Sequence, residues 1–139
     1  MEFFFDAALR EAEIAASEGN VPVGCVIVCD DVIVASSHNT KNSSGIAINH
    51  AELLCIAEAC KVLNSWYLND CVMYVTLKPC DMCLFAIAEA RIKKVFFLVD
   101  SFYGHNLNKN KDNIEIVDVK YKNSFYANML SLFFRDKRK

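Results

Sequence analysis

Residues 71–83, which read Cys-Val-Met-Tyr-Val-Thr-Leu-Lys-Pro-Cys-Asp-Met-Cys, set the organisation of the chain. Residues 71–77 are apolar and rich in β-branched side chains, which predicts a strand. Pro79 suits the start of a helix, and the residues that follow predict a helix over 80–90. A strand that leads directly into a helix is the repeating unit of an α/β fold.

The segments on either side continue this alternation. Their patterns predict a helix over residues 50–63 before the strand and a second strand over residues 94–99 after the helix. Further out, we expect helices over 3–17 and 124–136, strands over 23–29, 32–35 and 114–119, and loops over 38–49 and 106–113. Asp30 and Asp31 suit a hairpin turn between the first two strands. The pattern predicts a layered α/β domain whose sheet is covered by helices.

The composition describes a globular chain with no global affinity for nucleic acid. The chain has 139 residues, 54% of them hydrophobic and 23% charged, and a net charge of -2. It contains no repeat, no linker and only two prolines, so we expect a single domain over residues 1–139. No apolar run approaches the roughly 20 residues that cross a bilayer, and no secretory signal is recognisable, so we expect no membrane contact. Seven cysteines without a disulfide-framework spacing suggest reduced thiols in the cytoplasm.

Two short motifs carry the candidate chemistry, and each opens a predicted helix. Cys80 and Cys83 are three residues apart, so both thiols lie on one side of the first helical turn and suit two vertices of a tetrahedral zinc site. His50 begins the other helix and supplies a third ligand. Three protein ligands leave a fourth position for water, whose pKa zinc lowers to about 7. We therefore expect one Zn²⁺ per chain.

Glu52 follows His50 by two residues and is predicted to be the catalytic residue. At the first turn of a helix, both side chains can flank the helix end, one on the metal and one beside it. A carboxylate that is not a ligand can take a proton from water and deliver it to the substrate. A His-x-Glu motif combined with a separate Pro-Cys-x-x-Cys motif is the signature of nucleobase deaminases.

Two other interpretations of the cysteines remain. A lone Cys-x-x-Cys can be a redox pair, but no aromatic residue precedes Cys80 here. A structural zinc site would need a fourth protein ligand, and no candidate forms a second close pair with another Cys or His; the candidates are Cys55, Cys60, Cys71, His38 and His105.

Six segments resemble the cytidine-deaminase-like superfamily and are more similar still to bacterial tRNA-specific adenosine deaminases. They are residues 21–28, 38–40, 50–52, 73–83, 91–92 and 131–135, in the family's order and at family-like spacing. The resemblance implies a three-layer α/β/α fold with a central mixed five-stranded sheet, in a homodimer. It also implies conversion of adenosine to inosine at the wobble position of a tRNA, with the anticodon stem-loop as the partner.

The resemblance also implies roles for single residues. His50, Cys80 and Cys83 would hold the zinc, Glu52 would move protons, and Asn39 would hydrogen-bond the target base. Phe134 and Arg135 would help to hold the anticodon loop. At two places the sequence departs from the family. Lys78 stands where the family usually has Glu, and residues 100–106, which include His105, replace a loop that borders the substrate in the family.

Three functions therefore remain in competition. The leading hypothesis is a tRNA adenosine deaminase, favoured by the Phe-Phe-Arg ending and the basic tail at residues 135–139. A deaminase of a free base or nucleoside, such as cytosine or guanine, is favoured by the altered loop at residues 100–106 and by the near-neutral charge. A non-catalytic partner with a structural zinc is disfavoured by Glu52, because such a site has no use for a proton carrier.

Overall fold

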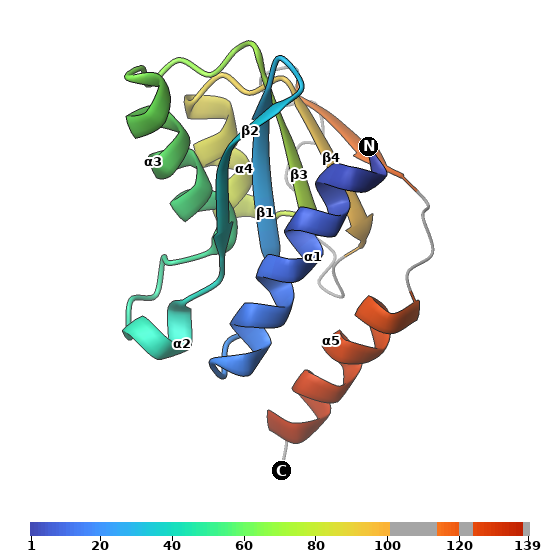
Figure 1. Ribbon diagram of the computed structural model, residues 1–139. Coiled ribbons are helices and arrows are strands. Elements are labelled where there is room, and N and C mark those ends of the chain that lie inside the picture. Colours follow the sequence, from blue (N-terminus) through green and yellow to red (C-terminus); the bar gives the residue numbers. More distant parts are fainter. Residues whose placement is uncertain (101–113, 120–123, 138–139) are drawn as a thin grey trace.

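Five apolar runs form one mixed sheet, in the spatial order β2-β1-β3-β4-β5. In this computed structural model, which describes residues 1–100, 114–119 and 124–137, the sheet lies at the centre of the molecule (Figure 1). β1 (Gly24–Cys29) runs antiparallel to both β2 (Val32–His38) and β3 (Cys71–Leu77). β4 (Lys94–Val99) and β5 (Glu115–Asp118) continue the sheet parallel to β3. The predicted loop over 106–113 and His105 lie outside the described residues.

Helices cover both faces of this sheet. α3 (Ala51–Leu63) and α4 (Asp81–Glu89) lie on one face, whereas α1 (Glu2–Ser17) and α5 (Ser124–Lys137) lie on the other (Figure 1). The predicted three-layer α/β/α fold is therefore confirmed. The single domain predicted over residues 1–139 stays a prediction. No described helix has the length and the apolar character that a membrane span requires.

Side chains from both faces of the strands are buried, which explains the continuous apolar runs. On β1, Cys25 and Ile27 pack in the core under α3 and α4, whereas Val26 and Val28 pack under α1. Successive side chains of a strand point to opposite faces, so a central strand with helices on both sides is apolar throughout.

The first predicted loop contains more regular structure than its polar sequence indicated. β2 extends to His38, three residues beyond the predicted end, because Ser36, Ser37 and His38 pair through their backbones with β1. His38 is held between two carboxylates: its Nδ1 lies 2.7 Å from Glu11 of α1, and its Nε2 lies 2.9 Å from Glu18, the C-cap residue of α1. A four-residue helix, α2 (Lys41–Ser44), occupies part of the same segment.

A buried chain of hydrogen bonds attaches α5 to the sheet. The Tyr126 side chain is 0% exposed, and its hydroxyl donates to the carbonyl oxygen of Pro22 at 2.7 Å. Thr76 Oγ1, on β3, donates to the same hydroxyl at 2.7 Å and accepts from the Gly24 backbone N–H at 3.1 Å. These hydrogen bonds join the beginning of β1, the central strand β3 and the last helix, α5. They therefore fix the position of the residues further along α5.

Candidate metal centre and pocket

The metal-ligating side chains come from the N-termini of two neighbouring helices. His50 caps α3 with extended backbone (φ -77°, ψ 151°), and Cys80 caps α4 in the same way (φ -73°, ψ 174°). Cys83 lies in the first turn of α4 and is 0% exposed. The first backbone N–H groups and the positive end of the dipole of each helix lie at this point and favour anionic ligands.

The separations of these side chains fit a tetrahedral zinc ion. His50 Nδ1 lies 3.7 Å from Cys80 Sγ and 3.5 Å from Cys83 Sγ. With Zn–N near 2.0–2.1 Å and Zn–S near 2.3 Å, tetrahedral angles require about 3.6 Å between nitrogen and sulfur. Within the described part of the chain, these three residues are the one group whose ligand atoms lie within 4.8 Å of one another. Zinc is the cofactor that this donor set fits, and three protein ligands leave one coordination position open, which is typical of catalytic zinc sites.

The protonation of the cluster also suits a cation. Hydrogen bonds from Cys83 and His50 lower the pKa of Cys80 to about 3, against the opposing effect of burial. The hydrogen bond to Cys80 and burial raise the pKa of Cys83, and the hydrogen bond to Cys80 raises that of His50. Cysteine binds a metal as the thiolate, so Cys83 would release its proton when a cation binds.

Glu52 lies beside the three ligands without belonging to their group. Its side chain is 4% exposed, and burial raises the pKa of its carboxyl to about 7, partly offset by a hydrogen bond from its own backbone N–H. No carboxylate oxygen of the described residues joins the cluster. This is the arrangement expected of a carboxylate that exchanges protons with a substrate.

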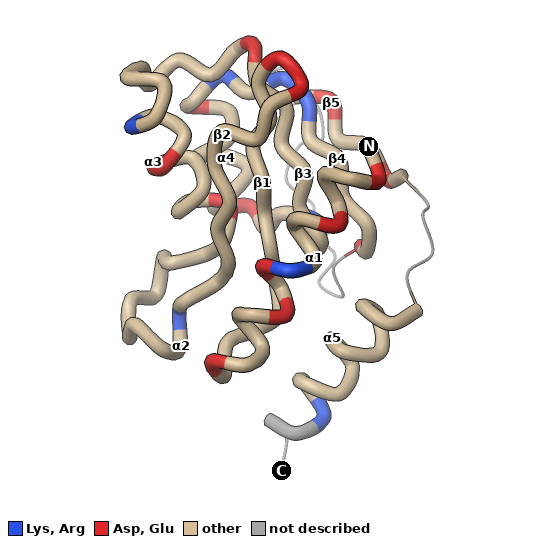
Figure 2. The backbone as a smooth tube through the Cα atoms, viewed as in Figure 1, with Lys and Arg blue, Asp and Glu red and all other residues tan. Residues whose placement is uncertain are grey.

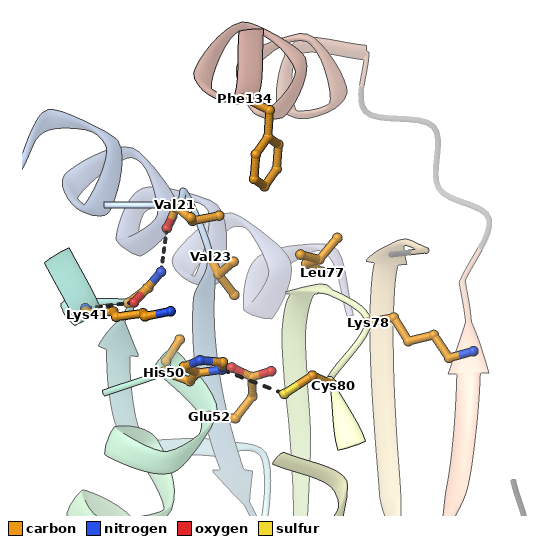
Figure 3. Close-up of a pocket in the computed structure, with 11 residues that line it drawn as sticks. Val21, Val23, Lys41, His50, Glu52, Leu77, Lys78, Cys80 and Phe134 are labelled. Atoms are coloured by element: carbon orange, nitrogen blue, oxygen red, sulfur yellow. Dashed lines mark hydrogen bonds between the residues drawn. The ribbon is translucent and has the colours of Figure 1, made fainter. Parts of the chain in front are cut away.

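A cavity of about 280 Å³ opens directly onto these residues. Figure 3 shows His50, Glu52 and Cys80 at its floor, with Phe134 of α5 reaching over it from the opposite side. Its volume is close to the lower end of the usual range for small-molecule sites, about 300 Å³. The other lining residues are Val21, Val23, Asn39, Lys41, Ala51, Leu77 and Lys78.

The structure brings Asn39 into this cavity, as the sequence predicted for a substrate contact. Asn39 is 7% exposed; its Nδ2 donates to the Val21 carbonyl at 3.2 Å, and its Oδ1 accepts from the Lys41 N–H at 2.9 Å. These two bonds fix the orientation of the amide and leave one N–H and one lone pair for another partner.

Two other predicted or singled-out residues lie outside the floor of the cavity. Arg135 is exposed and does not line the cavity, although its neighbour Phe134 does. The Lys78 side chain points away from His50 and Cys80 (Figure 3) and its Nζ lies 3.9 Å from Asp100 Oδ1. Sequence reasoning missed Lys41, whose side chain points toward the cavity, because a lysine in a polar loop carries no motif.

Three ligands at two helix N-termini beside a buried carboxylate define a zinc centre of the catalytic kind. The chain belongs to the cytidine and deoxycytidylate deaminase zinc-binding family, whose model matches residues 1–99. Among curated proteins, the tRNA-specific adenosine deaminase of Aquifex aeolicus is 47% identical over 96 residues, which cover 69% of this chain. The chain spans 64% of that relative's length.

Two solved structures share both the fold and part of the sequence. One comes from a biochemical and structural study of A-to-I editing by tRNA:A34 deaminases at the wobble position of transfer RNA. It is 36% identical with a TM-score of 0.70, over 72% of this chain and 77% of that chain. The other is the guanine deaminase of Bacillus subtilis, 31% identical with a TM-score of 0.68, over 99% of this chain and 94% of that chain.

Proposed function

We propose that this protein is a zinc-dependent hydrolytic deaminase that converts adenosine to inosine at the wobble position of a tRNA. The observation that carries the proposal is the position of the buried Glu52 carboxyl beside the His50, Cys80 and Cys83 cluster, at the floor of the cavity. The choice of substrate is supported by the relatives, which include a tRNA-specific adenosine deaminase and a wobble-position tRNA deaminase.

In the proposed reaction, water replaces the amino group on C6 of adenine, and ammonia leaves. His50, Cys80 and Cys83 would hold the zinc ion, which would supply Lewis acidity to the reaction. Glu52 takes a proton from the attacking water and passes it to the adjacent ring nitrogen. The same carboxyl then delivers a proton to the departing amine, so that adenosine and water give inosine and ammonia.

The proposed binding mode places the target base between Asn39 and Phe134. The free N–H and lone pair of Asn39 suit the polar edge of a purine, and the bonds that Asn39 makes to Val21 and Lys41 orient that amide in advance. Phe134 offers an aromatic ring to the face of a base, a contact worth about 1–3 kcal/mol. A base turned out of an RNA loop can reach this cavity, whereas a paired base cannot.

The charges around the cavity support an RNA partner that approaches along α2 and the C-terminal end of α5, and not along α1 (Figure 2). Acidic positions are spread along α1, whereas basic positions lie in α2 and near the C-terminal end of α5 (Figure 2). Lys41 and Arg135 are the basic residues of these two helices with described side chains, and they are suited to phosphates on either side of the flipped base. The side chains of the basic tail beyond Arg135 lie outside the described residues.

A second candidate is deamination of free guanine. It is favoured by the guanine deaminase of Bacillus subtilis, which is covered over 94% of its length by this chain. The same Glu52 and the same zinc ligands serve either purine, because the chemistry at the ring carbon is the same.

The two candidates are separated by one substrate panel. The zinc-loaded protein is incubated with an RNA hairpin that carries adenosine at the wobble position and, in parallel, with free adenosine, guanine, cytosine and cytidine. We expect inosine in the hairpin and little turnover of free adenosine, because the loop adds phosphate and stacking contacts that orient the target base. Rapid turnover of guanine without inosine in the hairpin would select the second candidate.

We also propose that the protein works as a homodimer in the cytoplasm. Several large apolar side chains are exposed in the two segments that carry the metal ligands: Ile46 is 50% exposed and Ile48 58% before α3, and Met82 is 37% and Phe85 44% exposed on α4. Exposed apolar side chains close to a binding site favour a protein partner, here a second copy. Sedimentation of the wild type beside Ile48→Asp tests the dimer, and a monomeric wild type would contradict it.

The proposed cytoplasmic location rests on the cysteines: all seven are free, which supports a reducing compartment.

A further inference from the structure

Two cysteines face each other across the sheet at the end farthest from the metal centre. Cys29, the last residue of β1, is the register partner of Cys71, the first residue of β3. Both pack on the same face, with the core that lies under α3 and α4. The metal ligands follow the other end of β3, about 20 Å away along the strand at roughly 3.3 Å per residue.

The backbone geometry at this pair permits a disulfide without rearrangement. Residues directly opposite each other in an antiparallel pair have Cα atoms about 4.5 or 5.5 Å apart, depending on whether they exchange hydrogen bonds. Both values lie within the range of about 4.4–6.8 Å that disulfides span. Because Cys29 and Cys71 are register partners and pack with the same core, their side chains lie on the same face of neighbouring strands, directly opposite each other.

The two thiols differ in their access to solvent. Cys71 is 3% exposed, and burial raises the pKa of its thiol to about 12, with a further contribution from Cys29. Cys29 is only half-buried and adjoins the exposed turn at Asp30 and Asp31. Cys29 is therefore the thiol that a dissolved reagent meets first, and Cys71 is the thiol behind it.

We propose that Cys29 and Cys71 form an oxidisable dithiol, a modification site for hydroperoxides that is separate from the metal centre. Cys29, as its thiolate, attacks the terminal oxygen of the hydroperoxide, and the O–O bond breaks to give Cys29 sulfenic acid and an alkoxide. The alkoxide takes up the proton that the Cys29 thiol released and leaves as an alcohol. The sulfur of Cys71 then attacks the sulfenic sulfur, the S–OH bond breaks, and water leaves with the Cys71 proton. Overall, two thiols are oxidised to one disulfide, and one hydroperoxide is reduced to an alcohol and water.

The other cysteines are less suited to this reaction. Cys25 and Cys55 also lie near each other, with Cys55 Sγ 3.5 Å from the Cys25 carbonyl oxygen, but both are 0% exposed. Cys60 is half-buried and packs against the same core, so it is the nearest competitor for Cys29. A second metal site is not supported, because no group of three ligand atoms within 4.8 Å includes Cys29 or Cys71 in the described part of the chain.

Peptide mapping of the zinc-loaded protein tests the proposal. The protein is treated with hydrogen peroxide, its remaining thiols are blocked with a maleimide, and it is digested with trypsin. Because trypsin does not cut before Pro79, the cysteines fall into three peptides, residues 11–41, 42–61 and 62–91. Before the thiols are blocked, we expect the whole protein to be about 2 Da lighter than the untreated protein. After digestion, we expect a cross-link between peptides 11–41 and 62–91, which fragmentation assigns to Cys29 and Cys71 and which dithiothreitol reverses.

Three matched variants make the assignment sharp. Cys29→Ser should form no cross-link and should lose thiols at least about tenfold more slowly. Cys71→Ser should stop at the sulfenic acid, about 16 Da heavier. Cys60→Ser should behave as the wild type, and zinc content should stay constant in all of them. A cross-link from 11–41 to 42–61, or the persistence of both reduced thiols in the wild type, would overturn the proposal.

Discussion

Replacing Tyr126 with Phe removes one oxygen atom from the buried hydrogen-bond chain that attaches α5 to the sheet. The Thr76 hydroxyl then loses its acceptor, and the Pro22 carbonyl loses its donor, both at 2.7 Å in the wild type. No water can replace the lost hydroxyl without a cavity, because the phenyl ring keeps the rest of the site filled. A buried polar group left without its partner costs about 1–3 kcal/mol, so the two together should cost about 2–6 kcal/mol.

Thermal unfolding followed by circular dichroism measures this loss. At roughly 3–4 °C per kcal/mol for a chain of this size, Tm should fall by about 6–24 °C. Tyr67→Phe is the matched control, because Tyr67 is 49% exposed, and its hydroxyl should be worth less than about 0.5 kcal/mol. The double variant Thr76→Val with Tyr126→Phe should cost less than the sum of the two single variants, because the two hydroxyls are partners. A Tm for Tyr126→Phe equal to that of Tyr67→Phe would refute this account of α5.

Three further perturbations test other parts of the structure. Gly24→Ala should lower the free energy of unfolding by about 2–3 kcal/mol or more, measured by urea denaturation, since a Cβ there would overlap the Ala8 carbonyl oxygen and lie 2.7 Å from the Ala12 nitrogen. Burial lowers the pKa of His38, but hydrogen bonds to the carboxylates of Glu11 and Glu18 outweigh it and raise the pKa above its usual value. The stability that His38 contributes should therefore be complete below about pH 6.5 and fall as pH rises through the raised pKa, and His38→Gln should remove this pH dependence. Arg135→Ala should reduce the slope of log affinity against log salt for an RNA hairpin by about 0.7, and an unchanged slope would exclude Arg135 from phosphate contact.

Most of the helices and strands were predictable because residues that become buried are apolar, and their spacing along the sequence differs between helices and strands. The runs that became β1, β3 and β4 are buried on both faces and are therefore apolar throughout. The end of β2 has no such apolar pattern. Ser36, Ser37 and His38 lie in the edge strand of the sheet and pair with β1 through backbone atoms, which every residue has. The order of the strands was also not predictable from pattern, because pairing depends on contacts between distant segments.

The proposed metal ligands could also be found from the sequence, whereas the walls of the cavity could not. The grouping of His50, Cys80 and Cys83 was predictable because zinc demands particular residue types at a spacing that a helix N-terminus can supply, and the assignment of these residues as ligands stays a prediction. The walls of the cavity carry no comparable signature, since Val21, Leu77 and Phe134 are ordinary apolar residues until the fold brings them together. The hydrogen bond from Tyr126 to the Pro22 carbonyl joins residues 104 positions apart. It forms only when the fold brings these residues together, so no local sequence pattern predicts it.

In the proposed reaction, three side chains hold the zinc and Glu52 only moves protons. Zinc content and inosine formation, measured in Glu52→Gln beside Cys83→Ser, separate these two roles. Glu52→Gln should retain one zinc per chain and lose turnover by at least about 10²-fold, the usual scale of general acid–base catalysis. Cys83→Ser should lose both zinc and turnover. A Glu52→Gln protein that turns over at the wild-type rate, or that loses its zinc as readily as Cys83→Ser, would contradict the claim.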